Sequence, residues 1–159
     1  MSKLLNIIAG MAGAAALNLL HESLKHKSVH TPRIDKLGEA GVQKTASFLN
    51  TPITDQETLY TATLASDLSS NAFYYSLIGS AGRKFLWPKA IISGLSAGIG
   101  ALKLPEPMGL NAAPVNKTQG RKALVVAYSL TGALVTAAVL RFLDKPKHKT
   151  RVKAFPENW

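Results

Sequence analysis

Four uncharged, largely apolar runs alternate with charged segments along this chain. Almost all of the charged residues lie outside these runs, which cover Leu4–Leu20, Leu68–Gly82, Ala90–Leu102 and Ala123–Leu140. The runs are about 13 to 18 residues long, and a helix that crosses a bilayer needs roughly 17 to 25. The two shorter runs reach that length when Asp67 and Lys89 at their ends are included. The pattern therefore predicts four short transmembrane helices.

The third run is rich in glycine, which predicts close contact with another helix. At helical spacing Ala90, Gly94 and Gly98 form one stripe and Ser93, Ala97 and Ala101 form the next, and Ile and Leu cover the remainder. In water each glycine would cost about 1 kcal/mol relative to alanine, whereas small residues in a bilayer let two helix backbones approach closely. The predicted helix-packing residues are Ala9, Gly13, Gly94, Ala97, Gly98 and Gly132.

The segment between the first two runs predicts an amphipathic helix. Thr31-Pro32 is a favourable helix start, and the residues after it separate into two faces. The apolar face would hold Ile34, Leu37, Gly41, Thr45, Phe48 and Leu49, and the polar face Asp35, Lys36, Glu39, Gln43 and Ser47. Such a helix is expected on a membrane surface or over the end of a bundle. Thr54 and Glu57 fit a capping box that starts the next helix.

Together these features predict an all-α fold: a polytopic membrane helical bundle of four short transmembrane helices, with an amphipathic surface helix between the first and second. The bundle would occupy residues 1–143, and 144–159 would form a basic tail. The expected spans are near 4–20, 64–82, 88–104 and 122–141, with the amphipathic excursion at 21–63.

Basic residues near the span ends predict the orientation. With four spans, the two long connections hold nine Lys and Arg and the terminal side holds ten, six of them between Arg141 and Lys153. Because cations close to span ends in short segments count most, both termini are expected in the cytoplasm of a multi-pass cell-membrane protein. The residues expected to meet lipid headgroups are Arg83, Lys84, Trp87, Arg141, Lys145 and Lys147.

The same topology brings polar residues from three span ends to one membrane face. The candidate polar cluster consists of Asn18, His21, Glu22, Asp67, Asn71 and Glu106, with Lys103 nearby. A histidine among carboxylates can bind a metal or relay protons. The residues also lie where water and headgroups satisfy polar groups, and they show no known metal-ligand spacing. We therefore favour solvated span ends and predict no metal site.

Composition narrows the function classes further. The net charge of +10 is typical of nucleic-acid binding, but the cations sit at the ends of apolar runs and no nucleic acid partner is expected. The chain has no cysteine, which excludes disulfides, thiolate metal sites and cysteine nucleophiles. It also carries no nucleophile elbow, phosphate loop or metalloprotease motif. We expect no enzyme activity and no cofactor.

These observations favour a non-catalytic accessory or scaffolding subunit of a larger membrane complex, with membrane lipids and other membrane subunits as partners. Two alternatives remain. The polar cluster would serve a small transporter or channel if it lined a path past the midplane, although the spans contain no central charge. Apolar runs of this length also suit the core helices of a soluble all-helical protein.

Overall fold

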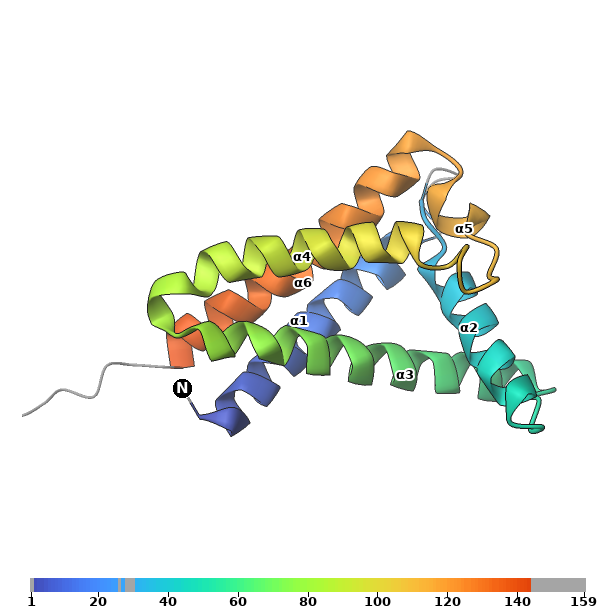
Figure 1. Cartoon of the computed structure of the whole chain (residues 1–159), viewed down its shortest axis with the longest axis horizontal. Coiled ribbons are helices and arrows are strands. Elements are labelled where there is room, and N and C mark those ends of the chain that lie inside the picture. The colour runs from blue at the N-terminus through green and yellow to red at the C-terminus, as the bar shows by residue number, and fades with distance from the viewer. Residues whose placement is uncertain (1, 26, 28–30, 144–159) are drawn as a thin grey trace, which may run out of the picture.

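The computed structural model describes residues 2–25, 27 and 31–143, and its regular elements are all helical (Figure 1). This confirms the predicted all-α class and the helical bundle. The basic tail, with Lys145 and Lys147, lies outside the described residues. The α-helices are α1 (Lys3–Leu24), α2 (Ile34–Phe48), α3 (Gln56–Ser76), α4 (Leu86–Lys103), α5 (Ala113–Asn116) and α6 (Gln119–Leu143), and the 3₁₀ helices are η1 (Leu77–Ala81) and η2 (Arg83–Phe85).

The four long helices pack in the order α3, α1, α6, α4. Helix α6 has its most extensive contacts with α4 and α1, and α1 also packs against α3. The start of α1, the η1–η2 turn and the end of α6 lie at one end of the bundle, whereas α2 and α5 lie at the other (Figure 1). We call these the terminal end and the cap end. Each predicted span coincides with a long helix, α3 being continued by η1.

The helix boundaries follow local sequence signals, with two corrections. The cap of α3 is Asp55 and not Thr54, because the Asp55 carboxylate accepts a hydrogen bond from the Thr58 backbone N–H at 2.7 Å. At the other end of α3 and η1, Gly82 has a φ of 71°, which an L side chain rarely adopts. The predicted loop between Pro105 and Arg121 contains the short helix α5, and α6 begins within it at Gln119.

Glycines sit where the long helices come closest. A Cβ atom on Gly94 would lie 2.7 Å from the Cα of Leu130, and one on Gly98 would lie 2.7 Å from the Cα of Val126. A Cβ on Gly13 would collide with the carbonyl group of Gly132. These distances leave no room for a side chain, so the α4–α6 and α1–α6 contacts require glycine. Among the other predicted packing residues, Ala9 is buried and Ala97 is half-buried.

Tyrosines fill the spaces that the small residues leave. Tyr75 and Tyr128 are almost completely buried, and the Tyr75 hydroxyl donates a hydrogen bond to the Ser129 carbonyl at 2.9 Å. The Tyr75 ring packs over Gly132, where a Cβ would lie 2.7 Å from it. A bulky ring on α3 is thus accommodated by the absence of a side chain on α6.

Substituting Tyr75 with phenylalanine tests this hydrogen bond. The ring stays in place and the hydroxyl is lost, so we expect destabilisation of about 1 kcal/mol. Chemical denaturation followed by far-UV circular dichroism measures the change. Tyr74→Phe is the control, because the Tyr74 hydroxyl donates to the Ser93 carbonyl at a site that is only partly buried, and it is expected to cost less. A Tyr75→Phe variant as stable as the parent would contradict the assignment.

The outer surfaces of α1 and α4 are covered by large apolar side chains. Leu19 on α1 is 70% exposed and Ile92 on α4 is 65% exposed. Met11, Ile91, Leu95 and Ile99 are exposed as well. Two helices, α1 and α6, are long and apolar enough to cross a membrane. In the most apolar 18-residue stretch of each helix, 33% of the residues of α1 and 44% of those of α6 are buried. Small residues therefore line the closest helix contacts of this bundle, and large side chains such as Tyr75, Ile78 and Leu86 fill its core. Further large apolar residues cover the outside.

Helix α2 differs from the predicted arrangement of its faces. Asp35 and Glu39, assigned to a solvated polar face, are buried, whereas Phe48 is 85% exposed and Leu49 is also exposed. The reason is close packing at Gly38, where a Cβ would lie 2.7 Å from the Thr63 side chain of α3. This contact turns the neighbouring carboxylates toward the bundle, where cations compensate them.

Candidate functional site

Residues from α1, α2 and α3 enclose a small polar cavity at the cap end. Its volume is about 10 Å³, which is room for a single water molecule. Four of the six residues of the predicted polar cluster line it, namely Asn18, His21, Glu22 and Asp67. They are joined by Asp35, Tyr60, Thr63 and Leu64. The predicted convergence of span ends is therefore present for the first and second spans.

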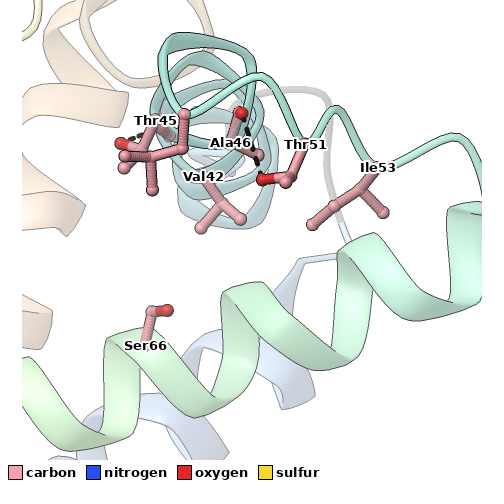
Figure 2. Close-up of a pocket in the computed structure, with 8 residues that line it drawn as sticks. Val42, Thr45, Ala46, Thr51, Ile53 and Ser66 are labelled. Carbon is pink, nitrogen blue, oxygen red and sulfur yellow. Dashed lines mark hydrogen bonds between the residues drawn. The ribbon is translucent and has the colours of Figure 1, made fainter.

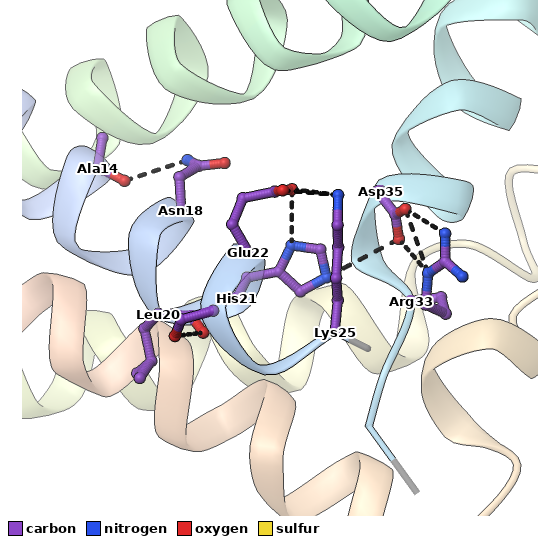
Figure 3. Close-up of polar contacts among 9 residues, drawn as sticks. Ala14, Asn18, Leu20, His21, Glu22, Lys25, Arg33 and Asp35 are labelled. Atoms are coloured by element: carbon purple, nitrogen blue, oxygen red, sulfur yellow. Dashed lines mark hydrogen bonds and ion pairs between the residues drawn. The ribbon is translucent and has the colours of Figure 1, made fainter. Parts of the chain in front are cut away.

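His21 stands at the centre of this cluster and is only 4% exposed. Its Nδ1 lies 3.9 Å from Glu22 Oε1 and its Nε2 lies 3.8 Å from Asp35 Oδ1 (Figure 3). Both distances exceed hydrogen-bonding range, and Nε2 has no hydrogen-bond partner among the described residues. The edge of the Tyr128 ring packs near the imidazole, with ring centroids 6.1 Å apart. His21 is thus enclosed between two carboxylates and an aromatic ring.

Each of these two carboxylates is paired with a cation. Arg33 forms a bidentate pair with Asp35, with its Nη2 2.6 Å from Asp35 Oδ2 (Figure 3). Lys25 lies 2.6 Å from Glu22 Oε2, one turn along α1. Burial raises the pKa of Asp35, but the hydrogen bonds and charge of Arg33, together with the Lys36 backbone N–H, outweigh this effect and hold that pKa below its ordinary value. The Arg33 backbone N–H also donates to the Pro114 carbonyl at 3.0 Å, which ties the start of α2 to α5.

The lowered pKa of Asp35 predicts a loss of stability in acid. The folded state holds the Asp35 proton less tightly than the unfolded state, so this contribution is complete above the unfolded pKa of 3.8. It disappears as the pH falls from 3.8 through the lower folded pKa. Denaturation midpoints measured from about pH 5 to about pH 3 should fall more steeply for the parent than for Asp35→Asn. Parallel curves for the two proteins would contradict this assignment.

Two residues of the predicted cluster lie apart from the cavity. Glu106 accepts a hydrogen bond from the Asn116 side chain at 3.1 Å. It lines a separate surface depression with Lys103. Asn71 lies one helical turn beyond Asp67 on α3 and does not line the cavity. The third span end therefore contributes to a different polar contact, on the side of the connection to α6.

The residue that sequence reasoning missed is Asp35. It was assigned to the solvated face of α2 because charged residues normally face water. The signal that identifies it is Arg33 two residues earlier, since a cation so close in sequence can neutralise a carboxylate buried at the first turn of a helix. Tyr60 and Thr63 were missed as well, because their place on α3 depends on where α2 crosses it.

The cluster lies where three helices meet, and its members come from α1, α2 and α3. Asn18 donates its side-chain amide to the Ala14 carbonyl of its own helix at 3.1 Å. No group of three or more His, Asp or Glu side chains within the described residues is arranged to hold a metal ion. We call this arrangement the clasp: Arg33 pairs with Asp35 within the start of α2, and His21 of α1 lies 3.8 Å from the same carboxylate.

A larger cleft separates α2 from α3 (Figure 2). Its volume is about 430 Å³, and Val42 and Thr45 of α2 face Ser66 of α3 across it. Ile53, from the segment between the two helices, closes one end. No ionisable side chain lines this cleft. It lacks groups for acid–base or metal chemistry and marks where α2 diverges from α3.

The predicted headgroup residues that the structure describes gather at the terminal end. Lys84 lies over the Phe85 ring, 5.6 Å from its centroid, and Trp87 in the first turn of α4 is 41% exposed. Arg141 is exposed near the end of α6, and Arg83 belongs to η2.

Comparison with models of known protein families, with curated protein sequences and with solved structures found no match for this chain.

Proposed function

We propose that this chain is a small integral membrane protein that acts as a non-catalytic accessory or scaffolding subunit of a larger membrane complex. The observation that carries the proposal is the combination of glycines at the closest helix contacts with large apolar side chains on the outer surface. Gly13, Gly94 and Gly98 are buried at helix contacts, while Leu19 and Ile92 are mostly exposed. A water-soluble bundle buries its large apolar side chains, whereas helices in lipid associate through small residues and turn large ones outward.

The dimensions of the long helices agree with four crossings. At 1.5 Å per residue, the 18 residues of α4 span about 27 Å and the 25 residues of α6 about 37 Å. A bilayer core is about 30 Å thick. In the proposal α3 and α4 therefore cross beside α1 and α6, and the exposed face of α4 with Ile91, Ile92 and Leu95 meets lipid or another subunit.

The distribution of charge supports cytoplasmic termini. The two long connections between the spans hold nine Lys and Arg and the terminal side ten, six of which lie between Arg141 and Lys153. Cations at span ends favour the cytoplasmic side. In the proposed orientation α2 and α5 lie on the opposite side of the membrane.

A scaffolding role fits the polar cluster better than transport does. A transporter needs ionisable groups along a hydrated path, whereas the cavity around His21 holds about 10 Å³ and its carboxylates Glu22 and Asp35 are paired with cations. The hydrogen bond from the Arg33 backbone to Pro114 and the fit of Gly38 against Thr63 fasten α2 to the bundle. In the proposal the clasp fixes the cap and the apolar outer faces of α1 and α4 receive neighbouring subunits.

Purification from native membranes tests this proposal. The membranes are washed with alkaline carbonate and dissolved in a mild detergent, and the mass of the particle is measured without its detergent. We expect the chain in the washed membrane pellet and, after solubilisation, in a particle heavier than its own 17.0 kDa that contains a second protein. A monodisperse particle of one chain with no partner would overturn the scaffolding role.

A further inference from the structure

A groove on the outer surface runs between α1 and α3, toward the terminal end. Its volume is about 520 Å³, within the range of about 300–1,000 Å³ that is typical of small-ligand sites. Ala14 and Ala72 provide small side chains in its lining, and Ile7, Met11 and Phe73 provide large ones. Met11 is 58% exposed and Phe73 is 72% exposed. The groove therefore presents an apolar channel to whatever surrounds the bundle.

One end of the groove approaches a cationic region. Lys3 lies one helical turn before Ile7, so the two residues share a face of α1. Lys84 and Lys89 belong to the same terminal end, where Lys89 bonds to the Ser80 hydroxyl of η1. The described carboxylates lie toward the other end, the nearest along α1 being Glu22. An apolar channel that opens beside cations with no carboxylate partner among the described residues matches an amphiphile with an anionic head.

We propose that this groove binds one acyl chain of an anionic phospholipid, with its phosphate beside Lys3. The inference rests on the proposed membrane location and names a specific lipid partner within it. The lining extends from Ile7 to Ala15, about 12 Å along α1, which suits a segment of acyl chain. A neighbouring transmembrane helix, about 10 Å wide, needs a seam along its whole length. The cations of the terminal end attract the phosphate.

Native mass spectrometry in a mild detergent tests the proposal with phosphatidylglycerol and phosphatidylcholine that have identical acyl chains. We expect one tightly retained phosphatidylglycerol per chain. Lys3→Gln should weaken its binding about fivefold, since one cation near an anionic headgroup contributes about 1 kcal/mol. Lys103→Gln at the other end of α4 is the charge control and should leave the affinity unchanged.

Two neighbouring serines of α3 provide a matched pair for the groove. Ser69 and Ser70 are both exposed, and Ser69 lines the groove while Ser70 does not. Ser69→Phe should abolish the phosphatidylglycerol adduct by filling the channel, and Ser70→Phe should retain it. Equal denaturation midpoints for the two variants would show that both fold alike.

Three outcomes would overturn the inference. The first is equal retention of phosphatidylglycerol by the two serine variants, and the second is no preference over phosphatidylcholine in the parent. The third is a dimer that Ser69→Phe dissociates, which would assign the groove to a second copy of the chain.

A carbonate wash of the same membranes separates this test from the proposed function. Protein in the pellet without a lipid adduct contradicts the lipid site alone, and protein in the supernatant contradicts the membrane location.

Discussion

Replacing Gly98 with alanine is expected to destabilise the bundle by about 2 kcal/mol, in the range of overpacked cores. The added Cβ would lie 2.7 Å from the Cα of Val126. A backbone atom cannot turn aside as a flexible side chain can, so α4 and α6 must separate and lose contacts along their shared interface. Denaturation of the detergent-solubilised protein, followed by far-UV circular dichroism, measures the loss.

Gly100 provides the control for this substitution on the same helix. A Cβ there would meet only the Leu104 side chain at 3.5 Å, an ordinary contact distance. Gly100→Ala should therefore be neutral, or stabilising by up to about 1 kcal/mol through helix propensity. If the two variants had equal stability, close backbone approach would not explain the glycines of α4.

Replacing Asp35 with alanine is expected to have the second large effect. It should lower the free energy of unfolding by about 2–3 kcal/mol. The substitution leaves the Arg33 guanidinium and His21 without the carboxylate between them. Removing one partner of a fully buried ion pair costs about 3–5 kcal/mol, and this value is lowered here because the Arg33 side chain is 34% exposed. We expect α2 to detach from the cap end, with faster proteolysis between α1 and α3.

A double-mutant cycle separates the ion pair from other effects of the substitution. Arg33→Ala alone should destabilise the protein, and the double variant should cost less than the sum of the single changes by at least about 1 kcal/mol. Additive losses would mean that Asp35 and Arg33 do not act as a pair. In that case the clasp at the cap end would have to be attributed to other contacts.

The four long helices were predictable because apolar runs and helix-breaking residues mark them directly. Pro88 falls in the first turn of α4, and Asn50, with a φ of 56°, follows the end of α2 where the Asn50-Thr51-Pro52 stop was predicted. The observed start of a helix differs from the predicted one where two neighbouring residues can both cap it. Asp55 caps α3 in place of Thr54, one residue away, and a sequence pattern does not decide between such neighbours.

The face that α2 turns inward was not predictable from its own periodicity. An isolated amphipathic pattern places Asp35 and Glu39 in water and Phe48 against the membrane surface or the end of the bundle. The observed orientation depends on Gly38 fitting against Thr63 of α3 and on Arg33 pairing with Asp35. Both are tertiary contacts between segments that the pattern treats separately.

The candidate site was predictable to the extent that topology determines it. Because α1 begins and α6 ends at one end of the bundle, Asn18, His21 and Asp67 come to the opposite end, and the structure places these residues around one cavity. The topology does not determine on which side of that end each residue lies. Glu106 accordingly belongs to the contact with Asn116 and not to the cavity.

Labelling of single cysteines in membrane vesicles tests most directly whether the bundle lies in hydrocarbon. The chain contains no native cysteine, so one introduced thiol is the only target for a water-soluble maleimide. Ile92→Cys lies on the exposed outer face of α4 and Lys103→Cys at its cap end. In open vesicles we expect rapid labelling at position 103, and labelling at position 92 only after the membrane is dissolved in denaturant. Equally rapid labelling at both positions in intact membranes would contradict a location of the bundle in hydrocarbon.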